Sequence, residues 1–262
     1  MTTLKGRNAL VTGSNGGIGY AIATALADQG CNVMLNGPGA PAEIERLRLA
    51  LAAKNIECIY SPADVGKPVQ IEQMIRDAEA RLGAIDILVN NAVIRHYHPI
   101  DEFPVEEWDA ALAVNLSAAF HTIRLALPGM KQRNWGRIIN MGSIHSTRAH
   151  ANRVDYVTAK HAIIGLTKTV ALEVAQTGIT CNALQPGWVL TPHSERQIAA
   201  QMEKSGSTRD ASIEALLQTR QPSRRMITRE QVAAFAVFLC TEAASSITGS
   251  ALSIDGGWSA AP

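Results

Sequence analysis

Residues Asn8 to Gly19 read NALVTGSNGGIG, an apolar run that passes directly into a loop rich in glycine. The apolar residues predict a buried strand over Asn8–Thr12, and the pattern after the loop predicts a helix over Gly17–Gln29. Gly30 then stands where a C-cap glycine would end that helix. A glycine loop between a strand and a helix is typical of a dinucleotide site, because the helix N-terminus offers N–H groups to a pyrophosphate.

The same alternation of strand and helix patterns continues along the whole chain. Further strands are expected at Cys31–Leu35, Glu57–Pro62, Ile85–Asn90, Arg137–Met141, Thr180–Leu184 and Ala251–Ile254, and further helices at Ala42–Lys54, Pro68–Arg81, Pro104–Met130 and Arg153–Gln176. The alternation predicts one α/β domain over residues 1–262, a Rossmann-type, doubly wound parallel sheet of about seven strands with helices on both faces. The polar stretch Thr191–Arg229 breaks the rhythm between the last two strands. Ligands bind outside the carboxyl ends of such strands, so we expect this stretch to form a helical substrate lid.

Composition excludes several classes of protein. The 262 residues are 47% hydrophobic and 18% charged with a net charge of +1, which indicates a large core and no basic tract for nucleic acid. The longest clear apolar run, Ala233–Cys240, is too short to span a bilayer, and residues 1–6 lack a signal-peptide pattern. The four cysteines form no C-x-x-C pair and read as buried thiols. We therefore expect a cytoplasmic protein without a membrane or nucleic-acid partner.

The residues after the second strand bear on the choice of dinucleotide. Asn36 stands about where a ribose-binding acid is often found, and its amide is expected to hydrogen-bond the ribose hydroxyls. Neither 14–16 nor 36–40 contains an Arg or Lys that would pair with a 2′-phosphate. This favours NAD over NADP. Asp64 and Val65, after the third strand, are expected to flank the adenine.

A tyrosine and a lysine at helical spacing predict the chemistry. Tyr156 and Lys160 are four residues apart on an expected helix and project from one face. A phenol has a reference pKa of about 10, which a nearby ammonium and a cationic nicotinamide would lower. Ser143, at the end of the fifth strand, is placed to hydrogen-bond a substrate oxygen, and Asn115 to hold a water next to Lys160. Together with the glycine loop, these residues predict hydride exchange between a nicotinamide cofactor and an alcohol or ketone.

These motifs resemble the short-chain dehydrogenase/reductase family over the whole length of the chain. The matching stretches are Thr12–Gly19, Asn90-Asn91-Ala92, Asn115, Ser143, Tyr156–Lys160 and Pro186-Gly187-Trp188. The resemblance implies catalytic roles for Asn115, Ser143, Tyr156 and Lys160, and a homotetramer. The chain departs from the family at Val93, where glycine is usual. The expected cofactor contacts are Gly13, Asn15, Gly17, Ile18, Gly19, Asn36, Asp64, Val65, Asn91, Ala92, Tyr156, Lys160, Pro186, Gly187, Val189 and Thr191.

Within that family the chain is most similar to bacterial enzymes that oxidise D-3-hydroxybutyrate. The resemblance implies a small hydroxy or keto acid, its carboxylate held by polar side chains and its methyl end walled by tryptophan. Arg95 stands where that group has glutamine, and Arg153 where it has lysine. Arg153 can hold a carboxylate in a fork, and Arg95 adds a second charge, so a longer or more acidic 3-hydroxy acid is one alternative. The expected substrate contacts are Arg95, Ser143, His145, Arg153, Tyr156, Trp188, Gln197 and Trp258.

Other interpretations remain open at this point. The loose basic cluster Arg220, Arg224, Arg225 and Arg229 leaves room for a reductase of another keto acid or of a carrier-linked 3-ketoacyl group. A regulatory scaffold that binds NAD without turnover is a second alternative, and Arg95 also reads as a solvated loop residue. His96 and His98 invite a metal interpretation, but two histidines without a neighbouring Asp, Glu or Cys cluster make a weak site, and no metal is expected.

Overall fold

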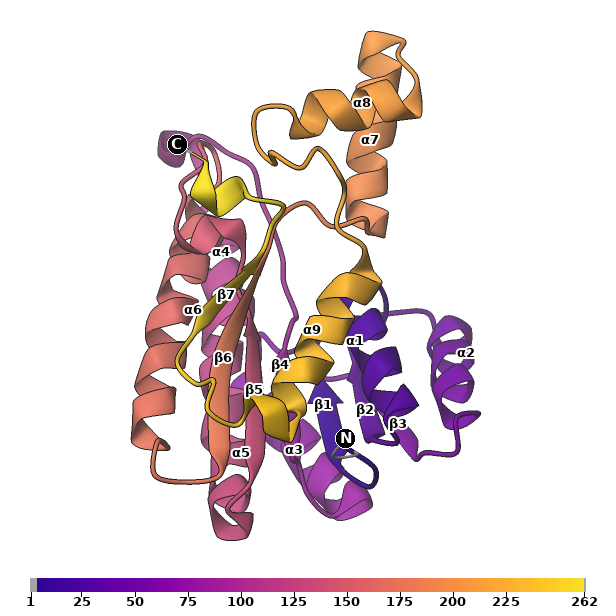
Figure 1. The fold of residues 1–262 in the computed structure, drawn as a ribbon, viewed down its shortest axis with the longest axis vertical. Coiled ribbons are helices and arrows are strands. Elements are labelled where there is room, and N and C mark those ends of the chain that lie inside the picture. Colours follow the sequence, from indigo (N-terminus) through magenta and orange to yellow (C-terminus); the bar gives the residue numbers. More distant parts are fainter. Residues whose placement is uncertain (1–3, 262) are drawn as a thin grey trace.

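The alternating apolar runs pair into one parallel sheet in the computed structural model, which describes residues 4–261. The seven strands lie in the order β3-β2-β1-β4-β5-β6-β7 (Figure 1). Their bounds are β1 Asn8–Val11, β2 Asn32–Asn36, β3 Cys58–Ser61, β4 Ile87–Asn90, β5 Gly136–Met141, β6 Ile179–Pro186 and β7 Ala251–Ile254. The chain leaves the centre in opposite directions after β1 and after β4, so the carboxyl ends of these two strands flank a crevice where ligands bind in this class of sheet.

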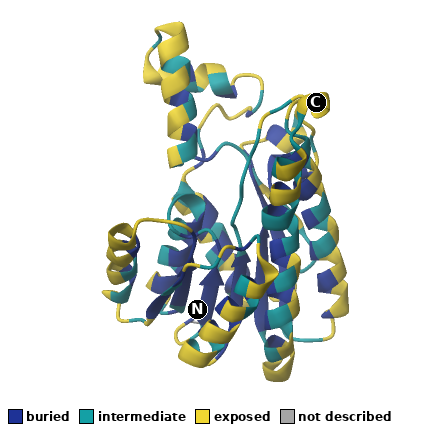
Figure 2. Ribbon diagram, turned by 180° about the vertical axis from the view of Figure 1, so that it is seen from behind, coloured by how far each residue is buried: buried dark blue, intermediate teal, exposed yellow. Residues whose placement is uncertain are grey.

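Helices cover both faces of this sheet, as the sequence predicts. They are α1 Gly17–Asp28, α2 Pro41–Ala52, α3 Pro68–Leu82, α4 Val105–Leu112, α5 Ala118–Arg133, α6 Val154–Glu173, α7 Pro192–Ser205, α8 Arg209–Leu217 and α9 Arg229–Cys240. Short helical turns lie at Ile100–Glu102, Ala113–Ser117, Ile144–Ser146, Glu242–Ala244 and Trp258–Ala260. Figure 2 shows buried strands at the centre and exposed residues on the outer sides of the helices.

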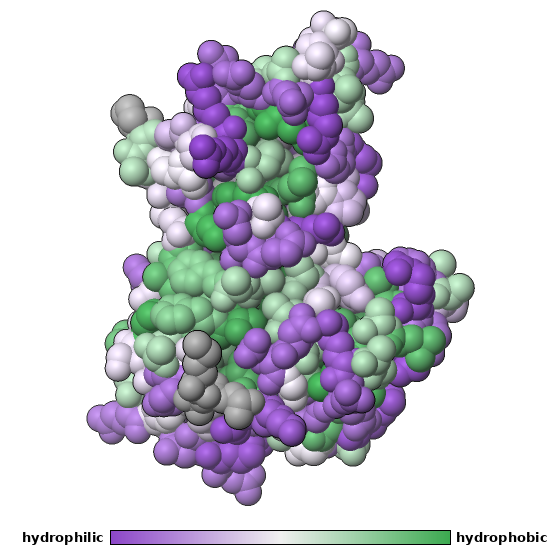
Figure 3. Space-filling model, turned by 45° about the vertical axis from the view of Figure 1, so that its right-hand side comes forward, coloured by the Kyte–Doolittle hydropathy of each residue, from purple (hydrophilic) through white to green (hydrophobic). Residues whose placement is uncertain are grey.

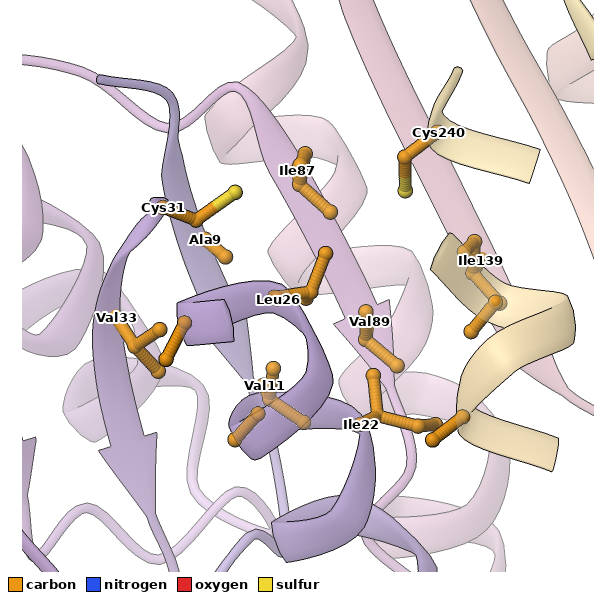
Figure 4. Packing of buried hydrophobic residues seen from close by; sticks show 14 of the residues in the cluster. Ala9, Val11, Ile22, Leu26, Cys31, Val33, Ile87, Val89, Ile139 and Cys240 are labelled. Atoms are coloured by element: carbon orange, nitrogen blue, oxygen red, sulfur yellow. The ribbon is translucent and has the colours of Figure 1, made fainter. Parts of the chain in front are cut away.

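Alternate residues of each central strand pack on opposite faces. Val11 of β1 and Val89 of β4 pack against α1, α2 and α9 in one cluster, to which Ile22 of α1 belongs (Figure 4). Leu10 and Leu88, the neighbouring residues of the same strands, pack in a second cluster with α3, α5 and α6. Because both faces are covered, the strands are apolar almost throughout, which is the signal that predicted them.

The predicted long helical region Pro104–Met130 is confirmed, and the structure divides it into three parts. The structure has α4, a π-helical turn over Ala113–Ser117, and α5, which continues to Arg133. By length and composition Val105–Arg133 would also pass as a membrane span. Here α5 packs against α3, β4 and β5, and α4 packs against α6, so core packing accounts for part of its apolar residues, while Val105 and Phe120 stay exposed.

The insertion between β6 and β7 projects beyond the sheet. Helices α7 and α8 pack on each other and stand apart from the main body (Figure 1). In Figure 3, apolar side chains gather on the inner part of the projecting region and on the body below it, while polar ones cover its outer margins. The buried Ile198 and Leu217 come from these two helices. The expected helical character of Thr191–Arg229 is therefore confirmed for α7 and α8, and closure of a lid stays a prediction.

Candidate active site

The glycine loop joins β1 to α1 and lies against the segment that follows β4. Gly13 has a φ of 61°, and a Cβ there would lie 2.8 Å from Ala92 Cα. A Cβ on Gly19 would lie 2.4 Å from Gly13 O, closer than any side chain tolerates. The Asn91 amide donates to Gly13 O at 2.9 Å and fixes the loop. The tight turn at Gly13 and the close helix–sheet approach at Gly19 are thus confirmed.

The N-terminus of α1 fits a pyrophosphate. Gly17 has a φ of 55°, and no described atom lies within 4 Å of a Cβ placed on it. The N-cap residue Gly16 has no side chain that could cap the helix, so the first N–H groups of α1 are left for a ligand. The helix dipole adds a positive field at the same place. These residues fit the diphosphate of a nicotinamide dinucleotide.

Asn36 is hydrogen-bonded within the protein. Its side chain is only 1% exposed, and its amide donates to Ser61 O at 3.2 Å and to Ala63 O at 2.8 Å. Its Oδ1 accepts from Gly13 N at 3.3 Å. The Asn36 amide therefore fastens the glycine loop to β3, and both of its hydrogens are taken before a ribose arrives. The structure therefore leaves no amide hydrogen of Asn36 for a ribose, and a ribose contact at this residue stays a prediction.

The other expected cofactor residues lie in two places, at the exposed edge near β2 and β3 and along the main cavity. Asp64 is exposed and accepts from Gly66 N at 2.9 Å, whereas Val65 packs into the second core cluster. The exposed amide of Asn15 donates to Pro38 O across the same edge. Eight further expected residues line the main cavity: Ile18, Asn91, Tyr156, Lys160, Pro186, Gly187, Val189 and Thr191. A dinucleotide would thus extend from the exposed edge at β2 and β3 into this cavity.

The expected catalytic side chains meet at the carboxyl end of β5. Ser143 follows that strand, Tyr156 and Lys160 lie on α6, and all three residues are buried. The Ser143 side chain lies beside the Tyr156 hydroxyl and contributes to lowering its pKa. The Lys160 ammonium donates to Met141 O and lies 5.6 Å from the Tyr156 ring centre. This arrangement can transfer a proton at the Tyr156 oxygen.

Asn115 lies in the π-helical turn behind these residues. Its Oδ1 accepts from Ile94 N and its amide donates to Ile94 O, both at 2.9 Å. Asn115 and Lys160 line a second cavity of about 10 Å³, together with polar atoms of Thr12 and Asn90. That space is about the size of one water molecule. The expected water between Asn115 and Lys160 stays a prediction, and the cavity supports it.

All eight expected substrate residues line one cavity of about 280 Å³. Arg153 lies between two aromatic rings, 4.7 Å from the Tyr97 centre and 4.4 Å from the Tyr156 centre. Its Nε is buried and has no hydrogen-bond partner among the described residues. Burial lowers the pKa of Arg153, which shows that its charge is desolvated without full compensation. A buried guanidinium with a free donor beside Tyr156 is a site for an anion.

Two histidines in the cavity are neutral. Burial, followed by the charge of Arg153, lowers the pKa of His145 to about 4. Burial, followed by the charge of Arg95, lowers the pKa of His193 to about 4. His145 also packs edge to face against Trp258, with ring centres 5.9 Å apart. At neutral pH these side chains offer hydrogen bonds without adding charge.

Comparison with known proteins assigns the family. A family model described as enoyl-(acyl carrier protein) reductase matches residues 13–259. The D-beta-hydroxybutyrate dehydrogenase of Cupriavidus necator is 49% identical over 255 residues, which cover 97% of this chain and 98% of that protein. The chain belongs to the short-chain dehydrogenase/reductase family. The D-beta-hydroxybutyrate dehydrogenase of Rhizobium meliloti is 48% identical, over 97% of this chain and 99% of that protein.

A solved structure of the same family supports the fold. L-sorbose reductase from Gluconobacter frateurii, in complex with NADPH and L-sorbose, aligns with a TM-score of 0.92, 30% identity and 97% coverage of both chains. The expected Rossmann-type fold is therefore confirmed, and so is the expected enzyme acting on a CH–OH group.

The pKa of Tyr156 is lowered by its surroundings. Burial raises the pKa of Tyr156, but the charges of Arg95 and Lys160, the Ser143 hydrogen bond and the charge of Arg153 together lower it to about 8. Arg95 lies 5.1 Å from the Tyr156 ring centre, nearer than Lys160. Arg95 is therefore not a solvated loop residue, because its charge stabilises the phenolate.

Replacing Arg95 with Gln should shift the pH dependence of the reaction. In the wild type, kcat/KM for alcohol oxidation should fall below pH of about 8, since the reaction needs the phenolate. Arg95→Gln removes a cation, raises the pKa of Tyr156 toward its ordinary value, and moves the inflection to higher pH. Profiles of log kcat/KM against pH for both proteins measure the shift. Superimposable profiles would show that Arg95 does not act on Tyr156.

Among the cavity residues that the sequence did not assign to the site are Tyr97, His150, His193 and Arg220, which carry aromatic or ionisable side chains. Tyr97 and His193 each lie two residues from an expected site residue, Arg95 and Thr191, which was the available signal. Arg220 was expected in a loose basic surface cluster. Its guanidinium instead lies 5.5 Å from the Trp188 ring centre, inside the cavity.

His96 and His98, which invite a metal interpretation, each pair with a carboxylate in the structure. His96 Nδ1 lies 3.0 Å from Asp155 Oδ2, and His98 Nε2 lies 2.9 Å from Glu107 Oε2. These pairs tie the segment after β4 to α6 and α4. No group of His, Cys, Asp or Glu suited to a metal ion occurs in the described residues 4–261.

Proposed function

We propose that the chain oxidises D-3-hydroxybutyrate, or a closely related short 3-hydroxy acid, to the 3-keto acid with NAD. The observation that carries this proposal is the buried, unpartnered Nε of Arg153 in the cavity of Tyr156. An anion bound there satisfies the orphaned donor and orients the substrate against the proton acceptor. The names of the two relatives near 49% identity support a hydroxy acid of this size.

The mechanism follows from the contacts around Tyr156. Bound NAD supplies the hydride acceptor. The Tyr156 phenolate accepts the proton of the substrate hydroxyl, while the neighbouring Ser143 hydroxyl holds the substrate oxygen in line. Lys160 keeps its ammonium beside the ring through its bond to Met141 O. The cavity next to Asn115 then offers a route by which a water exchanges the proton.

Turnover assays test the proposal directly. The purified protein is mixed with NAD and D-3-hydroxybutyrate, and the absorbance of reduced nicotinamide is followed, with the L-isomer and larger 3- and 4-hydroxy acids in parallel. We expect turnover of the D-isomer and little of the L-isomer. Equal turnover of uncharged secondary alcohols would contradict an anion site at Arg153. No turnover of any hydroxy acid despite tight NAD binding would favour the regulatory scaffold.

The segment after β2 supports NAD over NADP. Pro38, Gly39 and Ala40 are exposed and carry no charge that would pair with a 2′-phosphate. Pro38→Arg should therefore raise kcat/KM with NADP by about tenfold, through one charge-assisted hydrogen bond. Position 38 suits the change better than position 37. Gly37 has a φ of 139°, and a Cβ added there would lie 3.1 Å from the Asn15 side chain. Kinetics with both cofactors measure the effect. Pro38→Gln is the uncharged control, and an equal gain there would contradict the role of charge.

A reductase of carrier-linked substrates receives less support. Such a partner would need a free basic patch at the mouth of the cavity. Arg224 is instead paired with Glu214 at 2.9 Å, and Arg220 points into the cavity. A neutral thioester would also leave the buried Arg153 uncompensated. The short free acid is the substrate that the charges favour.

A further inference from the structure

The substrate cavity holds more positive charge than one carboxylate balances. Arg95, Arg153, Lys160 and Arg220 line it, and no Asp or Glu is among its lining residues. A monocarboxylate supplies a single negative charge. The remaining guanidinium groups, which are partly buried, would stay beside a small substrate without a counterion in the cavity.

The arginines of the cavity differ from other arginines of the same region. Arg209 pairs with Glu195 at 2.7 Å and Arg224 with Glu214 at 2.9 Å. Within residues 4–261, by contrast, Arg95, Arg153 and Arg220 have no carboxylate within 4.0 Å and donate no hydrogen bond. They lie over aromatic rings instead. A guanidinium carries five N–H donors, so most of the donors in this cavity are available to a ligand.

The free cations occupy two parts of the cavity wall. Arg95 and Arg153 flank Tyr156, with guanidinium carbons 5.1 and 4.4 Å from its ring centre. Arg220 comes from the segment after α8 and lies 5.5 Å from the Trp188 ring centre. Two positive groups held by different elements define two places for negative charge.

We propose that the preferred substrate is a short hydroxy dicarboxylate, whose first carboxylate binds Arg153 and Arg95 and whose second carboxylate binds Arg220. The inference rests on the proposed function, because the reaction at Tyr156 is the same. The hydroxyl proton passes to the Tyr156 oxygen, the hydride passes to NAD, and the carbinol becomes a ketone. The second carboxylate takes no part in the bond changes. It supplies binding and selects the substrate.

The test compares pairs of substrates that differ only in the second charge. The pairs are 3-hydroxyglutarate and 3-hydroxyadipate, each with its ω-monoamide, and D-3-hydroxybutyrate is the reference. We expect kcat/KM for at least one diacid to exceed that of its monoamide by about 10- to 100-fold, the range for one charge-assisted contact. If each diacid lies within threefold of its monoamide, the second anion site is refuted.

The variant Arg220→Gln tests whether Arg220 binds the second carboxylate. It should lower the diacid-to-monoamide ratio of kcat/KM by about tenfold or more. Arg225→Gln is the matched control, because it removes the same charge from an exposed residue outside the cavity and should leave that ratio unchanged. A loss in Arg220→Gln that is equal for diacid and monoamide would show a structural role and overturn the assignment.

The two proposals fail in different ways. Turnover of D-3-hydroxybutyrate with no preference for either diacid would remove the dicarboxylate inference and leave the proposed function intact. No reduced nicotinamide from any of these acids, with NAD or NADP, would overturn the proposed function itself.

Discussion

Replacing Tyr156 with Phe is expected to lower kcat for hydroxy-acid oxidation by about 10³-fold, within the range for a general acid–base group. Tyr156 is 5% exposed, and the nearby charges of Arg95 and Lys160 help lower its pKa to about 8. Phe keeps the ring against which Arg153 and His145 pack, but it offers no oxygen for the proton. Steady-state kinetics with NAD and D-3-hydroxybutyrate measure the loss.

The control for this prediction is Tyr20→Phe. Tyr20 lies on α1, outside the cavity, and its hydroxyl donates to Leu47 O at 3.3 Å. Loss of that phenol should leave kcat within twofold of the wild type. The dissociation constant for NAD, from fluorescence titration, should stay nearly constant in Tyr156→Phe. A Tyr156→Phe protein that kept more than a tenth of wild-type kcat would show that another group moves the proton.

The sheet could be predicted because its physical cause is local. Strands covered on both faces must be apolar almost continuously, and β1 and β4 each carry three apolar residues in a row. The turn into α1 needs glycine where a Cβ would meet backbone, as at Gly19. Both signals lie within a few residues of sequence, so reading along the chain is enough to find them.

The role of Asn36 could not be predicted in the same way. Its position after β2 is typical of a ribose contact, but its hydrogen bonds reach Ser61 and Ala63, more than twenty residues away. Which of two polar partners a side chain chooses depends on the tertiary structure. The same applies to His96, whose partner Asp155 lies on α6, although the sequence shows no acid next to it.

The residues of the substrate cavity also divide into those that the sequence predicts and those that it does not. Tyr156 and Ser143 were predicted because fixed spacing on a helix and at a strand end brings them together. Arg220 lies in a segment without periodicity between α8 and α9, and only the packing of that segment directs its guanidinium toward Trp188. Residues set by spacing were found from the sequence, and residues set by the path of a loop were not.

Replacing Arg153 with Met is expected to lower kcat/KM for D-3-hydroxybutyrate by about 100-fold, the value of a bidentate contact to a carboxylate. It should do so without loss of stability. Burial lowers the pKa of Arg153 more than the nearby charges raise it, so its charge is unfavourable in the folded protein, and its Nε has no hydrogen-bond partner among the described residues. Met keeps much of the side-chain volume and removes that charge. Thermal unfolding and steady-state kinetics on the same preparation measure both effects.

The conservative variant Arg153→Lys separates charge from geometry. Lys keeps the positive charge but lacks the planar fork, so we expect a loss in kcat/KM of about tenfold, intermediate between the wild type and Arg153→Met. Loss of activity in Arg153→Met together with a Tm lower by 5 °C or more would mean that the arginine holds the fold and not the substrate. Lost turnover with an unchanged or higher Tm would mean that the folded protein tolerates a destabilising charge at position 153 because the substrate anion needs it.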